Sequence, residues 1–218
     1  ATIEGAKALG MDDEIGTRSE LSIENRSDRE VFVQSGDIVK GGRQDRVISL
    51  DVIVPPRSGK LPLNSFCVEA GRWTKRGKEA SGKFTSNTEM LSSNKLRLAA
   101  KYKQNQGMVW SSVAEQQKKI NENLRAMKGD QNLDVTANAS GTSLQLTLEN
   151  KELKEMSDEY VSKLKSIVNG KQRPLGFAFL INGELKNADL YGRADLFAEL
   201  WPKLLKAAGY QAASLLWL

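Results

Sequence analysis

The sequence has no histidine, and its 218 residues include a single cysteine, Cys67. Without an imidazole, neither a Ser-His-Asp nor a Cys-His catalytic arrangement can form, and the common zinc sites lack their ligands. A lone cysteine also excludes an intrachain disulfide. No cofactor is therefore predicted, although a divalent cation such as Mg²⁺ or Ca²⁺, which binds oxygen ligands, stays compatible with this composition.

The sequence also lacks an apolar run long enough to span a bilayer, and it lacks a basic tail. Its net charge of +5 is spread along the chain and interleaved with acidic residues. No aromatic-plus-basic motif is present, so no nucleic acid is expected as a partner, and an anionic small molecule fits the charge better. The start at Ala1 fits an exported protein after signal removal and also a trimmed cytoplasmic one. The sequence indicates no oligomeric state.

Hydrophobic residues make up 39% of the chain and charged residues 27%, which is typical of a globular domain. At this length we expect one domain spanning residues 1–218. The order of periodic segments predicts an α+β fold with an antiparallel β front part, a helical middle, a late β-hairpin and a closing C-terminal helix.

In the front part, residues 2–9 have helical spacing, and residues 20–34 resemble a hairpin with a turn of Asn, Ser and Asp. Residues 47–54 and 61–68 are predicted strands, separated by a segment that begins with Pro55-Pro56. The polar stretch 74–94 has few apolar anchors, which predicts a long, mobile loop.

Beyond residue 94 the period becomes helical, with a short helix followed by amphipathic helices over 108–128 and 153–168. Between them, three alternating leucines suggest a strand over 144–148. The apolar run 175–181 and the Asn182-Gly183 turn predict a hairpin that returns over 185–191. The last helix covers 194–207, and Pro202 should kink or split it.

The first of two unusual turns runs from Ser35 to Arg46 and contains Asp37 and Gly41-Gly42. These glycines let backbone N–H groups approach a ligand, and the neighbouring arginines supply charge, which is how proteins hold phosphate. Asp37 and Asp45 could orient the arginines or bind a ribose hydroxyl. The alternative is a tight turn whose charges pair with one another. The candidate ligand-binding residues here are Gly41, Gly42, Arg43, Gln44, Asp45 and Arg46.

The second turn contains Cys67, Glu69, Arg72 and Trp73. On a strand, Cys67 and Glu69 face the same side, and a nearby arginine would lower the pKa of the thiol. The alternatives are a cysteine packed in the core, a salt bridge between Glu69 and Arg72, and a tryptophan in the core rather than stacked on a base. The catalytic candidates are Glu69, Asp37 and Cys67; Arg72 and Trp73 are candidates for ligand binding.

Three blocks stand in order along the chain. They are residues 36–46 (GDIVKGGRQDR), residues 67–73 (CVEAGRW) and a late block containing GFA, ING, DLYG and FAELWPKLL within 176–205. Together they resemble a bacterial family, the ARG and rhodanese-phosphatase-superfamily-associated protein (ARPP) domain, over nearly the whole chain. Family members have a further segment before the part matching 2–9, so we expect a front sheet one strand short or a trimmed chain.

The resemblance implies a link to the metabolism of NAD-derived or ADP-ribosylated compounds, and hence a ligand similar to ADP-ribose. It implies no particular reaction. A hypothesis from another class is a non-catalytic interaction module, in which the turns are structural and a partner docks on 74–94 or on the apolar tail 212–218. The two hypotheses differ on whether the turns meet at a hollow that water can reach.

Overall fold

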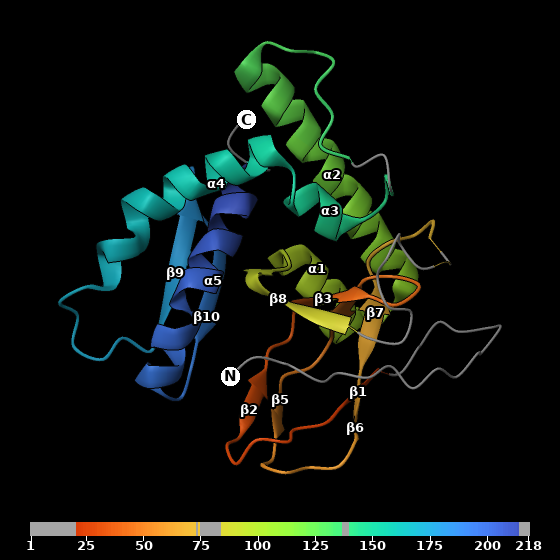
Figure 1. Ribbon diagram of the computed structural model, residues 1–218. Coiled ribbons are helices and arrows are strands. Elements are labelled where there is room, and N and C mark those ends of the chain that lie inside the picture. Colours follow the sequence, from red (N-terminus) through yellow and green to blue (C-terminus); the bar gives the residue numbers. More distant parts are fainter. Residues whose placement is uncertain (1–20, 73, 75–83, 137–139, 214–218) are drawn as a thin grey trace.

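The computed structural model describes residues 21–72, 74, 84–136 and 140–213 (Figure 1). The predicted helix over 2–9 lies outside these residues. The described part has an α+β fold with antiparallel strands in its first half, helices in the middle, a late β-hairpin and a C-terminal helix, as the sequence predicts. No helix within these ranges is long and apolar enough to cross a membrane.

The strands of the first half form short antiparallel sheets that share one apolar core. The four-stranded sheet has the order β7 (Ser65–Cys67), β4 (Arg46–Ile48), β3 (Asp37–Gly41) and β8 (Phe84–Leu91). Two smaller pairs join β1 (Leu21–Ile23) to β6 (Leu61–Leu63) and β2 (Val31–Val33) to β5 (Val52–Val54). The pairs extend from one end of the molecule in Figure 1.

The predicted hairpin over 20–34 is wrong, because β1 and β2 pair with β6 and β5 and not with each other. The cause lies in the turn between them. The side-chain amide of Asn25 donates to the carbonyl oxygens of Val54 (3.2 Å) and Pro55 (2.9 Å) and also to that of Arg29. Asn25 therefore links the turn between β1 and β2 to the end of β5 and the residue after it. This contact holds the turn beside β5.

The predicted loop over 74–94 is also wrong for residues 84–91. These residues form β8, which pairs with β3 from Gly41↔Phe84 to Asp37↔Leu91. The sequence FTSNTEML lacks the alternation of a half-buried strand, and the backbone ladder to β3 supplies the stabilisation that its pattern does not indicate. Residues 75–83 lie outside the described part.

The helical middle consists of α1 (Asn94–Leu98), the π-helical turn η1 (Ala99–Lys103), α2 (Gln106–Lys128), α3 (Leu144–Leu148), α4 (Lys151–Leu164) and the 3-10 turn η2 (Lys165–Val168). The predicted strand over 144–148 is wrong. Leu144 and Leu148 are buried four residues apart, which fits a helix, and the Ser143 side chain accepts a hydrogen bond from the Leu146 N–H as an N-cap.

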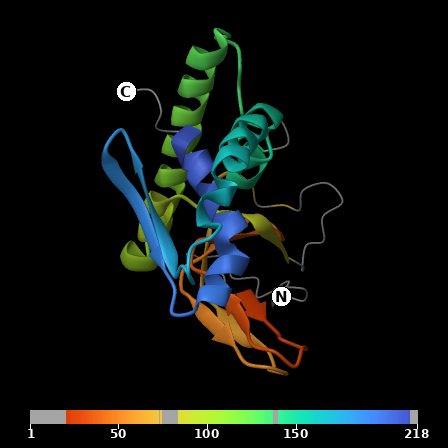
Figure 2. The same ribbon diagram turned by 90° about the vertical axis from the view of Figure 1, so that its left-hand side faces the viewer.

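The hairpin consists of β9 (Gly176–Ile181) and β10 (Glu184–Leu190), joined by Asn182 and Gly183, both at positive φ as a type I′ turn requires. The closing helix α5 (Ala194–Ala213) continues through Pro202 and is not split there. In both views α5 runs beside the hairpin (Figures 1 and 2), and it packs against α4, β8 and β9.

The buried apolar residues form three clusters. One lies between the β1–β6 and β2–β5 pairs and the four-stranded sheet, which contributes Val39, Ile48 and Phe84. Another is formed by the aromatic face of α5 with Phe197 and Trp201. The largest joins the four-stranded sheet to α1, α2, α3 and α4 around Ile38 and Ile120, both fully buried. Burying a side chain of this size contributes about 1.5–3 kcal/mol. The largest cluster holds in place the end of the four-stranded sheet at which the two predicted turns lie.

Candidate functional site

The register of the four-stranded sheet brings the two predicted turns together. Arg46 opens β4 and Cys67 closes β7, and these residues are directly paired. The ladder continues one step further, because the Val68 N–H donates to the Asp45 carbonyl oxygen over 3.0 Å. The turn over 41–46 and the segment 67–72 are therefore neighbours; we call them together the turn cluster.

Gly42 forms the tightest point of the turn cluster. Its φ is +59°, and a Cβ there would lie 2.4 Å from Cζ of Phe84 on β8, so only glycine fits without a shift. The Gly41 N–H donates to Oδ1 of Asp45 over 3.0 Å, which closes the turn. The glycine pair thus allows the turn to pack closely against β8.

Arg72 links both halves of the turn cluster. Its Nη2 lies 2.6 Å from Oε2 of Glu69 and 3.5 Å from Oδ1 of Asp45. Its Nη1 donates to the carbonyl oxygens of Gly42 (3.0 Å) and Thr74 (2.6 Å). The side chains of Arg72, Asp45 and Glu69 are almost completely withdrawn from water, at 7%, 0% and 0% exposure. The salt bridge between Glu69 and Arg72, which the sequence offers as the structural alternative to ligand binding, is therefore present. At these three side chains the two turns meet as paired charges away from water.

Glu69 is an ionised carboxylate held by several donors. Burial alone would raise its pKa, but Arg72, Ser140 and the N–H of Asp45 (3.3 Å) hold the pKa below its ordinary value. A third segment reaches the same place, because Ser143 pairs with Glu69 as a β-bridge and its hydroxyl donates to Oδ2 of Asp45 over 3.1 Å. A carboxylate held this way is a counter-ion rather than a base poised near neutral pH.

Cys67 and Arg46 form the second contact between the turns, with Nη1 of Arg46 2.6 Å from Sγ of Cys67. Burial raises the pKa of the Cys67 thiol, and the opposing effect of Arg46 does not overcome it. Desolvation also lowers the pKa of Arg46. A buried thiol with a raised pKa is a poor nucleophile. The arrangement therefore favours the core role for Cys67 that the sequence left open.

Asp37 is not part of the turn cluster. It lies at the opposite end of β3 from Gly41 and is buried. Its carboxylate forms an ion pair with Lys203 of α5 and accepts a hydrogen bond from the Gln34 N–H over 3.3 Å. Asp37 therefore joins the first sheet to the closing helix, apart from the other candidates.

The remaining candidates differ in their surroundings. Arg43 is exposed. Gln44 is only 1% exposed, and neither its Oε1 nor its Nε2 has a hydrogen-bond partner among the described residues; the same holds for Nε of Arg46. Trp73 lies outside the described residues. The turn cluster thus contains paired charges together with a buried amide that is unsatisfied within the described chain.

Two contributors were not predicted for this site. Gln106 at the start of α2 holds the backbone of Cys67 from both sides, accepting from its N–H (2.9 Å) and donating to its carbonyl oxygen (2.8 Å). Ser143 arrives from the N-cap of α3. Their sequence signals are those of helix starts, and only the packing of α2 against β7 and the bridge from Ser143 to Glu69 show that they reach the turns. Within the described ranges, no group of three acidic or cysteine side chains could hold a metal ion.

The fold and the turn cluster define an α+β domain with a buried Arg–carboxylate centre where two turns meet. The sequence profile of the ARG and Rhodanese-Phosphatase-superfamily-associated Protein domain matches residues 9–216, and the chain belongs to this family. No curated protein and no solved structure matches the chain significantly.

Proposed function

We propose that this domain binds a nucleotide-type anion, such as ADP-ribose or another NAD-derived compound, at the turn cluster. The observation that carries the proposal is the Gln44 carboxamide, which is 1% exposed and has no partner among the described residues for its donor or its acceptor. Leaving a buried polar group unsatisfied costs about 1–3 kcal/mol. A ligand that presents a matching acceptor and donor, as an adenine edge does, recovers this free energy.

Charge at the rim of the cluster supports the same ligand class. Arg43 is exposed beside the Gly41-Gly42 turn, and the half-buried Arg46 behind it has a buried Nε without a partner in the described chain. Two guanidinium groups next to a glycine turn suit a phosphate or a diphosphate. In this proposal the turn over 42–45 opens to admit the base, while the phosphate stays at the rim.

Binding fits the electrostatics better than a reaction does. The lowered pKa of Glu69 and the raised pKa of Cys67 leave a carboxylate that is already ion-paired and a thiol that stays protonated. Neither group is tuned toward neutral pH, as an acid–base catalyst or a thiolate nucleophile would be. We therefore assign recognition, and no chemical step, to the turn cluster.

Isothermal titration calorimetry with ADP-ribose, NAD, AMP and adenosine, with and without Mg²⁺, tests the proposal. We expect the phosphorylated compounds to bind and adenosine to bind weakly. Gln44→Met, which keeps the volume but removes the unsatisfied amide, should retain or gain stability and lose affinity. Arg43→Ala should lose affinity, whereas Arg29→Ala, at an exposed arginine elsewhere, should not. Absence of binding by every compound would refute the proposal.

A second candidate is the interaction module, in which the turn cluster is purely a structural lock. The contacts of Arg72 favour it, because this one side chain binds two carboxylates and the carbonyl oxygens of Gly42 and Thr74. Under this alternative, Glu69→Ala loses stability, and no nucleotide binds to the wild type or to Arg43→Ala. Nucleotide binding that Gln44→Met abolishes in a folded protein excludes it.

A further inference from the structure

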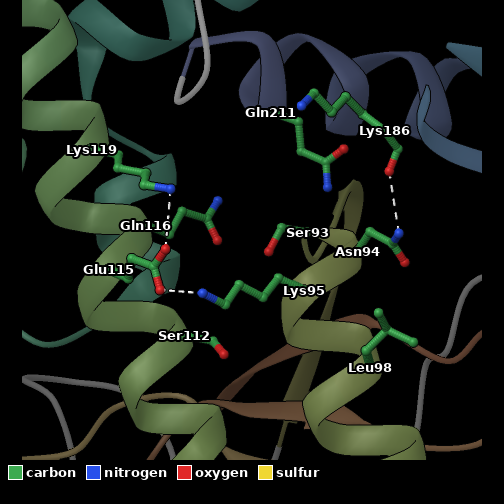
Figure 3. A pocket seen from close by; sticks show the side chains of 10 residues that line it. All are labelled: Ser93, Asn94, Lys95, Leu98, Ser112, Glu115, Gln116, Lys119, Lys186 and Gln211. Carbon is green, nitrogen blue, oxygen red and sulfur yellow. Dashed lines mark hydrogen bonds and ion pairs between the residues drawn. The ribbon is translucent and has the colours of Figure 1, made fainter. Parts of the chain in front are cut away.

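A cavity lies apart from the turn cluster, between α1, α2, β10 and α5 (Figure 3). It has a volume of about 280 Å³, and none of the turn-cluster residues lines it. In Figure 3, α2 forms one side of the cavity and α1 the facing side, while Gln211 of α5 and Lys186 of β10 lie across one end. The cavity is thus built where the helical middle meets the C-terminal hairpin and helix.

The lining of this cavity is positively charged. Among the described residues that line it are three lysines, Lys95, Lys119 and Lys186, and one carboxylate, Glu115, so within this part of the chain positive charge exceeds negative charge. Glu115 forms ion pairs with Lys95 and with Lys119, the latter over 3.1 Å, and these contacts lower its pKa. Lys186 pairs with Glu184, which does not line the cavity. An anion is therefore the complementary guest.

A buried amide points to a ligand as well. Gln116 is 8% exposed, and its Oε1 has no hydrogen-bond partner within the described part of the chain. Figure 3 shows its side chain extending from α2 into the same space as that of Gln211 from α5. A buried carbonyl oxygen without a partner is costly, and a hydroxyl group of a guest would satisfy it. Leu98, 47% exposed at the same cavity, offers an apolar edge.

From these observations we propose that the cavity is a binding site for a small phosphorylated sugar. Lysine ammonium groups bind phosphate as point charges, the Gln116 oxygen accepts a sugar hydroxyl, and Leu98 packs against a ring face. The volume sets the size, because ligand sites for larger molecules span about 300–1,000 Å³. A monosaccharide phosphate fits this volume, whereas a dinucleotide exceeds it, so this ligand differs from the one proposed for the turn cluster.

Glu115 acts in this site as an internal competitor for the phosphate. Its carboxylate occupies Lys95 and Lys119, and all three side chains are at least 40% exposed. Ion pairs at such exposure are weak, so a doubly charged phosphate displaces the carboxylate. Removing the charge of Glu115 should therefore strengthen ligand binding, which a merely structural ion pair would not do.

The test is calorimetric titration of the wild-type chain with ribose 5-phosphate, glucose 6-phosphate, inorganic phosphate and free ribose. We expect the sugar phosphates to bind more tightly than inorganic phosphate, and ribose not to bind. Lys119→Met should weaken sugar-phosphate binding by about tenfold or more. Glu115→Gln should tighten it by about threefold. Gln116→Leu should remove the preference for sugar phosphates over inorganic phosphate.

The matched control is Lys118→Met, because Lys118 precedes Lys119 on α2, is 76% exposed and does not line the cavity. It should bind as the wild type does. Absence of binding by all anions, equal weakening by Lys118→Met and Lys119→Met, or weaker binding in Glu115→Gln would each overturn the proposal. Circular dichroism confirms that each variant is folded.

Discussion

Arg72 Nη2 lies 2.6 Å from Oε2 of Glu69, three residues earlier, and the two side chains are only 7% and 0% exposed. A surface pair of this kind would contribute little. Here, the desolvation of both charges is offset by Asp45, by two backbone carbonyl oxygens and by the N–H of Asp45. The stability of the turn cluster therefore depends on each charge keeping its partners.

Replacement of Arg72 by methionine should lower the free energy of unfolding by about 3–5 kcal/mol, because it leaves the Glu69 and Asp45 carboxylates buried without a cation. Urea denaturation followed by circular dichroism measures this change. A suitable control is Lys118→Met, since Lys118 and Glu122 form an exposed pair at 3.8 Å, and its loss should stay within about 0.5 kcal/mol. Equal effects of the two substitutions would contradict the stabilising role of the buried pair.

The lowered pKa of Glu69 predicts a dependence of stability on pH. In the folded chain the pKa lies below the ordinary value of 4.5, so the unfolded state takes up a proton first as the pH falls. The contribution of ionised Glu69 to the unfolding free energy is complete above the pKa of Glu69 in the unfolded chain. It is lost as the pH falls through the lower pKa of Glu69 in the folded chain. We expect the difference in unfolding free energy between wild type and Glu69→Gln to shrink below about pH 4.5. A difference that stays constant from pH 7 to 3 would contradict this.

The sequence does not show that the two turns meet; the binding hypothesis only requires it. The register of the four-stranded sheet is what brings them together. Glycine, arginine and acidic residues mark both turns, but adjacency depends on β4 and β7 pairing at Arg46 and Cys67, some twenty residues apart. Asp37 illustrates the limit: it shares β3 with Gly41, yet its pairing partner Lys203 belongs to the last helix. No local pattern encodes that contact.

The helices and the late hairpin were predictable because their signals are local. The three- and four-residue spacing of α2 and the Asn182-Gly183 turn each specify one structure. The structure of residues 144–148 was not predictable in this way. Leucines at every second position fit a strand, but the first and the last of the three also fit one helical turn. The Ser143 cap and the packing of that turn against α2 stabilise the helix instead of a strand. Packing against α2 cannot be predicted from five residues.

The Cys67 thiol should react slowly with alkylating reagents in the native protein. It is 3% exposed, and burial raises its pKa despite the contact with Arg46. We expect iodoacetamide at pH 8 to modify the native thiol about 100-fold more slowly than the urea-unfolded one, because reaction then requires local opening. Arg46→Met should not speed the native reaction, because Arg46 lowers the pKa of the Cys67 thiol and its removal raises that pKa further. A native rate as fast as the unfolded rate would show an activated thiolate instead.

Gly42→Ala should destabilise the turn cluster for two separable reasons. Its φ of +59° is unfavourable for alanine by about 1–2 kcal/mol, and the new Cβ would lie 2.4 Å from Cζ of Phe84, adding about 1–3 kcal/mol of overpacking. Gly129→Ala isolates the first term, because Gly129 has a similar φ of +67° and nothing within 4 Å of its Cβ position. Thermal and urea unfolding of both variants should show the larger loss for Gly42→Ala. Equal losses would mean that Phe84 gives way without cost, and that the approach of β8 to this turn does not require glycine.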